Sequence, residues 1–163
     1  MPTGNQSCAF YTDQSKSLLL VRGILVLKDT NTLLEIRKDW NGVEALRNKL
    51  RASAFASMGI LGGIFPFTLS NAAHNLPFLH AFSVLNEVLI ALEKEGRFKC
   101  NSIFLGKLLE ASEMVLPWKD FSTIETGVGR RNDVAHRADL LERAECWKYV
   151  DAIKLELSLW GIV

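Results

Sequence analysis

Apolar residues recur at steps of three and four along most of this chain, the spacing that places side chains on one face of an α-helix. The two longest runs of this kind in the middle of the chain are Leu46, Leu50, Ala54, Met58, Leu61 and Phe65, and Phe78, Phe82, Leu85, Leu89 and Leu92. Two later runs are Phe104, Leu108 and Val115, and Leu140, Ala144, Trp147, Val150, Ile153, Leu157 and Trp160. No run alternates as a strand would. The pattern predicts an all-α, up-and-down bundle of about five or six helices.

Helix-ending and helix-starting residues separate these runs. The boundaries they predict are a start near Asn75 and Pro77, an end at Gly96, a start at Asn101 or Ser102 and an end before Pro117. An earlier apolar run, 18–27, is too uniform for its spacing to identify it, and we interpret it as a helix. Leu33, Leu34 and Ile36 continue that run beyond the turn residues 29–31.

The length of 163 residues predicts one domain. Residues 1–15 are polar and lack periodicity, so we expect a flexible N-terminal segment followed by a single helical domain over 16–163. A net charge of +1 excludes a polybasic protein, and 48% hydrophobic residues argue against disorder. No secretory signal pattern is present, which predicts a cytoplasmic protein. The three cysteines, Cys8, Cys100 and Cys146, show no CxxC spacing, so we expect reduced thiols, no metal site and no cofactor.

Residues 52–86 contain no Asp, Glu, Lys or Arg. Part of this segment approaches the roughly 20 apolar residues that cross a bilayer. However, its serines, glycines and asparagines, with His74, would need hydrogen-bond partners in lipid, so we do not expect a membrane span. A buried core helix or a homodimer interface accounts for an uncharged surface better, and the sequence leaves these two alternatives open.

The segment 129–137, GRRNDVAHR, concentrates three arginines around one histidine. If 121–136 is helical, Arg131 continues an apolar stripe of Phe121, Ile124, Val128 and Ala135. A guanidinium on such a stripe is costly unless it is paired or opens onto a cleft. On the adjacent stripe, Asn132 and His136 lie one turn apart.

This combination suits cleavage of a phosphodiester bond in RNA without a metal. His136 is suited to proton transfer, Arg131 to stabilising charge on the phosphate, and Asn132 to orienting either group. Arg130 and Arg137 would hold neighbouring phosphates. Because one histidine cannot be both acid and base in a single step, two copies of the motif facing each other in a dimer are expected.

The run Arg131-Asn132-Asp133-Val134-Ala135-His136 resembles the RNxxxH form of the Rx4-6H motif of HEPN domains. The resemblance rests on the motif within about residues 120–160, and elsewhere on helix content alone. It implies a dimeric helical bundle that cuts RNA, with Arg131, Asn132 and His136 as catalytic residues. It also implies a role as a toxin or defence effector, with an antitoxin such as a nucleotidyltransferase-type protein as partner. The tyrosine that follows the histidine in some toxin members is absent, and Ala138 stands two places on.

Two other interpretations remain. In the first, the chain is a non-catalytic HEPN-like module that binds RNA, a nucleotide or a partner protein. A purely structural origin of the motif predicts instead an ion pair between Asp133 and Arg137, a hydrogen bond between Asn132 and His136, and an Arg131 that reaches solvent.

Several further residues are expected to be structural. His74 and His80 lack neighbouring carboxylates, which favours core or capping roles over metal binding. Cys100 and Cys146 are expected as small buried hydrophobes. The aromatic residues near the motif, Trp118, Phe121 and Trp147, are expected in the core rather than stacking on bases.

Overall fold

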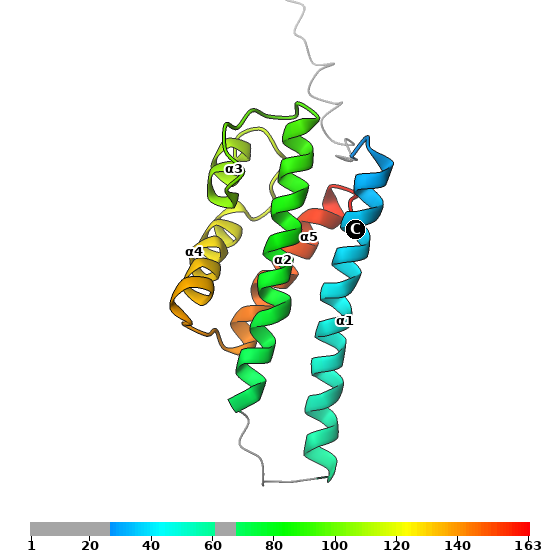
Figure 1. Ribbon diagram of the computed structural model, residues 1–163, viewed down its shortest axis with the longest axis vertical. Helices are drawn as coiled ribbons and strands as arrows, with labels where there is room; N and C mark the ends of the chain where they lie inside the picture. The colour runs from blue at the N-terminus through cyan, green and yellow to red at the C-terminus, as the bar shows by residue number, and fades with distance from the viewer. Residues whose placement is uncertain (1–26, 61–67) are drawn as a thin grey trace, which may run out of the picture.

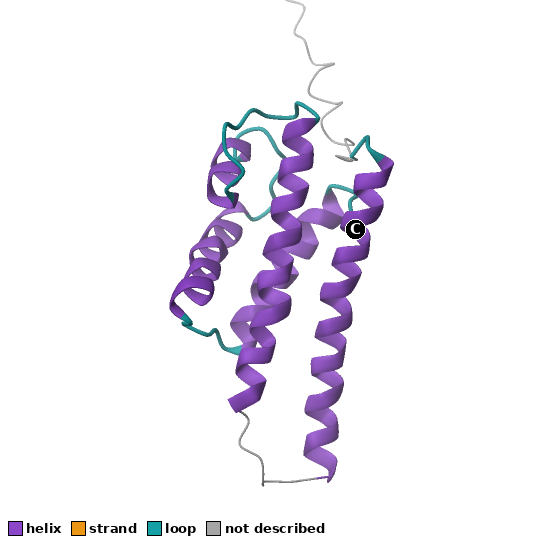
Figure 2. Cartoon of the chain, in the orientation of Figure 1, coloured by secondary structure: helices purple, strands orange, loops and turns teal. Residues whose placement is uncertain are grey.

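The computed structural model describes residues 27–60 and 68–163, which form five α-helices. They are α1 (Thr30–Ile60), α2 (Thr68–Lys94), α3 (Leu105–Ser112), α4 (Phe121–Arg137) and α5 (Arg143–Leu159). The described part of the chain contains no strand (Figure 2), so the all-α prediction is confirmed. The predicted segment 1–15 lies outside the described residues, and so does the predicted helix over 18–27, except for Leu27, which is buried.

α2 is the central helix of the bundle. α1 lies antiparallel on one side of it, α3 and α4 lie on the other, and α5 crosses behind it (Figure 1). The predicted apolar stripe of α2 is confirmed, because Phe78, Phe82, Leu85, Leu89 and Leu92 are all fully buried. By length and composition, Ala73–Lys94 in α2 is also apolar enough to cross a membrane, but 56% of its most apolar window is buried, as in a core helix.

Over residues 30–51, α1 buries a different face from the one that its apolar stripe predicted. The later stripe residues Ala54, Met58, Leu61 and Phe65 lie outside the residues whose side chains are described. Leu46 is 37% exposed and Leu50 is half-buried. The buried face is Leu33, Ile36, Trp40, Val43 and Arg47. Because one of these five is an arginine, a search for apolar residues could not find the complete face.

The predicted start of α2 at Asn75 and Pro77 is wrong. The helix begins at Thr68 and contains Pro77 in its interior, although proline cannot donate the helical hydrogen bond to residue 73. Asn75 has another role, since its buried side chain bonds to the loop before α5. The predicted end is correct, with Gly96 at a φ of 73° just after the helix.

The stripes of the last helices are shorter than predicted. α3 ends at Ser112 and buries Leu108, while Phe104 and Val115 lie outside it and are 74% and 55% exposed. Ser102 does not cap the helix, because its hydroxyl accepts from the N–H of Phe104 instead. α5 begins only at Arg143, so Leu140 is exposed in the preceding loop, whereas the stripe from Val150 to Trp160 is buried as predicted.

α1 and α5 are joined by long polar side chains. Arg37 donates to the carbonyl oxygens of Ile162 (2.7 Å) and Gly161 (3.2 Å). Lys154 pairs with Glu44 at 2.9 Å. Arg47 forms a two-pronged ion pair with Asp151, and its Nη2–Oδ2 distance is 2.9 Å.

Candidate functional site

α4 carries the RNDVAH motif, and its start is fixed by two carboxylates. Asp120 is the N-cap and accepts from the backbone N–H of Thr123 at 3.2 Å. Hydrogen bonds from Thr123 hold the pKa of Asp120 below its ordinary value. The second carboxylate, Glu156 of α5, is fully buried and accepts from the backbone N–H groups of Lys119 and Asp120. The register of α4 is therefore set at its first turn.

α4 continues through both of its glycines. A Cβ atom at Gly127 would lie 2.6 Å from Cζ of Phe82 and 2.8 Å from Cδ1 of Tyr149, closer than packed atoms allow. Gly127 therefore permits α4 to approach α2 and α5 closely. At Gly129, nothing lies within 4 Å of a built Cβ, so this position has no such requirement.

Arg131 lies between buried positions of α4, since Val128 and Val134 are 9% and 7% exposed. Its own side chain is half-buried, whereas Ala135, which the sequence placed on the same apolar stripe, is exposed. Nη1 of Arg131 donates to Oδ1 of Asn132 at 3.1 Å, and the buried Nε has no partner. No ion pair to Arg131 occurs within the described residues. This guanidinium is thus partly desolvated without a balancing carboxylate.

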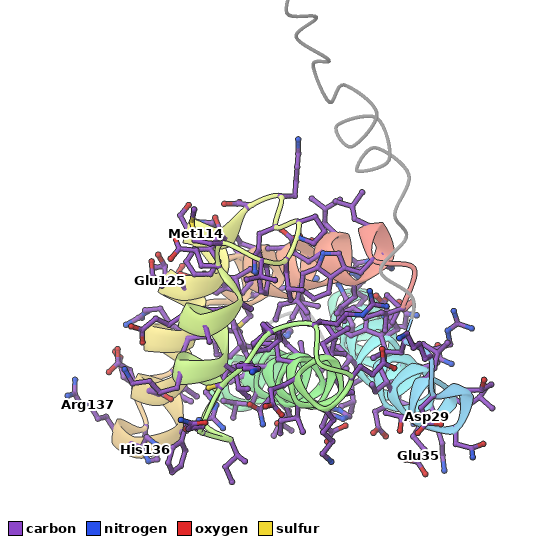
Figure 3. The ribbon with its side chains drawn as sticks, turned by 90° about the horizontal axis from the view of Figure 1, so that it is seen from above. Asp29, Glu35, Met114, Glu125, His136 and Arg137 are labelled. Atoms are coloured by element: carbon purple, nitrogen blue, oxygen red, sulfur yellow. The ribbon has the colours of Figure 1, made fainter. Side chains whose placement is uncertain are left out.

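His136 is exposed in the last turn of α4 and forms no side-chain hydrogen bond with any described residue. The hydrogen bond to Asn132 that the structural interpretation predicts is absent here. Figure 3 shows the His136 and Arg137 side chains leaving the end of the helix in different directions. The imidazole is therefore open to solvent and to a ligand.

Arg130 and Arg137 differ from Arg131 because each of them pairs with at least one carboxylate. Arg130 contacts Glu145 and Asp139 at 3.1 Å each and Asp133 at 3.6 Å. The hydrogen bond with Glu145 is the main cause of its raised pKa. Arg137 is 78% exposed and pairs with Asp133 at 3.1 Å, which is the ion pair that the structural interpretation predicts.

The turn after α4 is closed by backbone geometry. Ala138 adopts a left-handed conformation with φ 55°, and the N–H of Asp139 bonds to the carbonyl of Asp133 at 3.4 Å. The loop then bonds to α2, because the amide side chain of Asn75 exchanges two 3.1 Å hydrogen bonds with the backbone of Leu141. The motif is consequently held at both ends of α4.

The remaining candidates are mostly structural. His74 is 5% exposed and packs edge-on against Trp147, with ring centroids 5.4 Å apart. Cys146 is fully buried, and burial raises its pKa to about 12, which makes it a poor nucleophile. Cys100 is only half-buried, and Cys8 lies outside the described residues. Within 27–60 and 68–163, no three His, Cys, Asp or Glu side chains gather in a way that could hold a metal ion.

Sequence reasoning did not single out Arg143, the first residue of α5. It is exposed and forms no ion pair with a described residue, and it lines a hollow together with Trp147. Its recognition depends on tertiary structure, because nothing in its sequence context distinguishes it from a solvated helix end.

Comparison with known proteins identifies no relative. No protein-family model matches the chain, and no curated protein or solved structure is similar to it.

Proposed function

We propose that this chain is a metal-independent endoribonuclease of the HEPN type. The observation that carries the proposal is the state of three side chains at one end of α4. Arg131 is partly desolvated without a carboxylate partner, Asn132 is bonded to it, and His136 is exposed without a hydrogen bond. An arginine without a carboxylate partner and an accessible imidazole are what phosphate binding and proton transfer need.

The Arg131–Asn132 hydrogen bond gives each group a role. Oδ1 of Asn132 is occupied as an acceptor, so its amide N–H groups are left to donate to a phosphate oxygen. The remaining N–H groups of Arg131 can donate to the same phosphate and stabilise the charge that develops on it.

The reaction needs one base and one acid. The base removes the proton of a ribose 2′-hydroxyl, whose oxygen then attacks the adjacent phosphorus. The bond from phosphorus to the 5′-oxygen breaks, and the acid protonates that oxygen. The products are a 2′,3′-cyclic phosphate and a 5′-hydroxyl, and no metal is consumed or required.

A homodimer supplies both groups. Arg131 and His136 are five residues apart, which on an α-helix is about 140° around the axis and about 7.5 Å along it. One copy therefore directs the two side chains to different sides of α4. Two copies facing each other would place His136 of one opposite His136 of the other, so that one accepts and the other donates a proton. Within the uncharged segment 52–86, Phe78, Phe82 and Leu85 of α2 are fully buried in the core, so these residues are not available as a dimer surface.

The biological role follows from the resemblance of the motif. We propose a cytoplasmic toxin or defence effector, which an antitoxin, such as a nucleotidyltransferase-type protein, would hold inactive. The second candidate is a module that binds RNA, a nucleotide or a protein without cutting. It is favoured by the ion pairs of Arg130 and Arg137, which neutralise much of the charge around the motif.

The test is incubation of the purified protein with single-stranded and structured RNA in EDTA, beside His136→Ala, Arg131→Ala and Lys99→Ala. Lys99 is exposed and follows the C-terminal end of α2, whereas the loop after the motif bonds to Asn75 near the other end of that helix. Lys99 therefore serves as a matched control. We expect the wild type and Lys99→Ala to leave 2′,3′-cyclic phosphate ends, and the two motif variants to lose more than about 100-fold in rate. Absence of cleavage by a folded dimer, or cleavage that persists in His136→Ala, contradicts the proposal.

A further inference from the structure

A hollow of about 560 Å³ opens at the first turn of α5. Glu142, Arg143, Ala144 and Trp147 line it. It is separate from the motif residues, but only the short loop 138–142 connects the end of α4 to it. The chain from Arg137 to Arg143 spans at most about 22 Å, which is within the length of a few nucleotides of RNA.

Buried polar groups pack against Trp147, one of the four residues that line the hollow. Arg47 of α1 is 6% exposed and lies over the indole ring of Trp147, 5.0 Å from its centroid, while its guanidinium is fixed by Asp151. His74 of α2 packs edge-on against the same indole. Trp147 of α5 is therefore held by side chains of two other helices, α1 and α2, yet it remains half-exposed.

Unpartnered polar atoms accompany Trp147. Nδ1 of His74 and Nε1 of Trp147 are buried and have no hydrogen-bond partner. His74 faces two of the lining residues, since it contacts Trp147 and lies close enough to Arg143 for that charge to contribute, after burial, to its lowered pKa. Buried polar groups are rarely left without a partner, and Trp147 is the one of these two residues that lines the hollow.

The hollow offers both signs of charge, from Arg143 and from the carboxylate of Glu142, and Glu145 lies in the first turn of α5. The side chain of Glu142 does not cap α5, so the first N–H groups of this helix are left without a side-chain acceptor. Arg143, in the same turn, forms no ion pair with any described residue. The N-terminus of a 17-residue helix beside an unpaired arginine favours a phosphate.

We propose that this hollow binds one nucleotide of single-stranded RNA, with the base against Trp147 and its phosphate at Arg143 and the first turn of α5. The inference rests on the proposed function, because it extends the path of the same substrate away from His136. Glu142 fits such a ligand through the ribose, whose hydroxyl groups can donate to a carboxylate. The hollow would then select which nucleotide lies a fixed distance from the scissile bond.

The experiment measures binding separately from cleavage. A fluorescein-labelled single-stranded RNA of twelve nucleotides is titrated with the His136→Ala protein, and anisotropy is recorded at about 100 mM salt. The same background then carries Arg143→Ala, Trp147→Phe or, as the control, Lys99→Ala. Arg143 is exposed, so its substitution leaves folding intact and avoids the risk that changes at Trp147 carry. A parallel sample with 4-thiouridine in the RNA is irradiated, and the crosslinked peptide is sequenced.

We expect Arg143→Ala to lower the affinity about fivefold, and Trp147→Phe at least about twofold, because it retains part of the stacking surface. Lys99→Ala should bind as its background does, and the crosslink should fall on the peptide that contains Trp147. Binding that Arg143→Ala leaves unchanged, with a crosslink elsewhere, overturns this inference even if the wild type cuts RNA. Binding lost in Arg143→Ala from a protein that cuts no RNA supports the hollow and contradicts the nuclease proposal. A folded protein that neither binds nor cuts RNA overturns both.

Discussion

Glu156 accepts a hydrogen bond of 2.7 Å from the backbone N–H of Asp120, and so ties α5 to the start of α4. The same carboxylate accepts two contacts of 2.9 and 3.0 Å from the N–H of Lys119. A fully buried carboxylate thus satisfies two backbone donors just before the helix that carries the motif. Beyond the other end of α4, the pair of hydrogen bonds between the Asn75 side chain and the backbone of Leu141 has a similar role.

Glu156→Gln should lower the free energy of unfolding by about 1 to 3 kcal/mol, since one oxygen acceptor is replaced by a donor that faces buried N–H groups. Urea unfolding followed by circular dichroism measures the change. Glu113→Gln, at an exposed position beyond α3, is the control and should change stability by less than about 0.5 kcal/mol. Equal effects of the two substitutions would show that the Glu156 contacts contribute little.

Gly127→Ala should destabilise the protein by about 1 to 3 kcal/mol, because the new Cβ overlaps Phe82 and Tyr149. Gly129→Ala adds a methyl group to open space and should stabilise α4 by about 0.5 to 1 kcal/mol. Thermal unfolding of both variants provides the comparison. A stable Gly127→Ala protein would mean that α4 does not need its close approach to α2.

Ala138→Gly should stabilise the protein by about 0.5 to 1 kcal/mol, because glycine adopts the left-handed conformation of the turn without the Cβ penalty. Ala135→Gly is the matched control. It places glycine on the exposed face of α4, just before this turn, and should lower the free energy of unfolding by about 1 kcal/mol. If both substitutions destabilise the protein equally, the turn at 138 is not left-handed in solution.

His74 makes stability depend on pH. Burial, and then the charge of Arg143, lower its pKa below the ordinary histidine value of 6.5. The folded protein therefore binds fewer protons than the unfolded chain between that lowered pKa and 6.5. The stabilisation is fully present above pH 6.5 and decreases as the pH falls through this window. Urea midpoints at pH 7.5 and 5.5 should differ less in His74→Gln than in the wild type, and an equal difference in both proteins would show that His74 does not cause the pH dependence.

Arg137→Ala should reduce the slope of log affinity for RNA against log salt by about 1, if this exposed arginine contacts a phosphate. Arg130→Ala should leave that slope nearly unchanged, because Glu145, Asp139 and Asp133 already engage its guanidinium. Anisotropy titrations of RNA at several salt concentrations distinguish the two residues. A smaller slope for Arg130→Ala and an unchanged slope for Arg137→Ala would assign the phosphate contact to Arg130 instead. The sequence alone was compatible with either arginine.

Much of the fold could be predicted because helical periodicity is a local property. The stripe from Phe78 to Leu92 needed only the spacing of side chains, whereas a helix over 121–136 was an assumption, because Gly127 and Gly129 weaken the helical pattern there. The buried face of α1 could not be predicted, since it includes Arg47, whose burial depends on Asp151 more than 100 positions away in the chain. The interior position of Pro77 in α2 was not predicted for a related reason. Local rules place a proline at the start of a helix, but the tertiary fold tolerates this one inside α2.

At the candidate site, the sequence by itself determined the helical class and the position of Arg131, Asn132 and His136 along one helix, because residue spacing fixes both. Only the tertiary structure decided which of the arginines are neutralised by carboxylates and why Gly127 is required. It also decided that Trp147 and Arg143 line a hollow near the motif. These features depend on α1, α2 and α5 meeting α4 or one another in space. Contacts between distant segments leave no periodic signal in the sequence, so packing rather than spacing determines them.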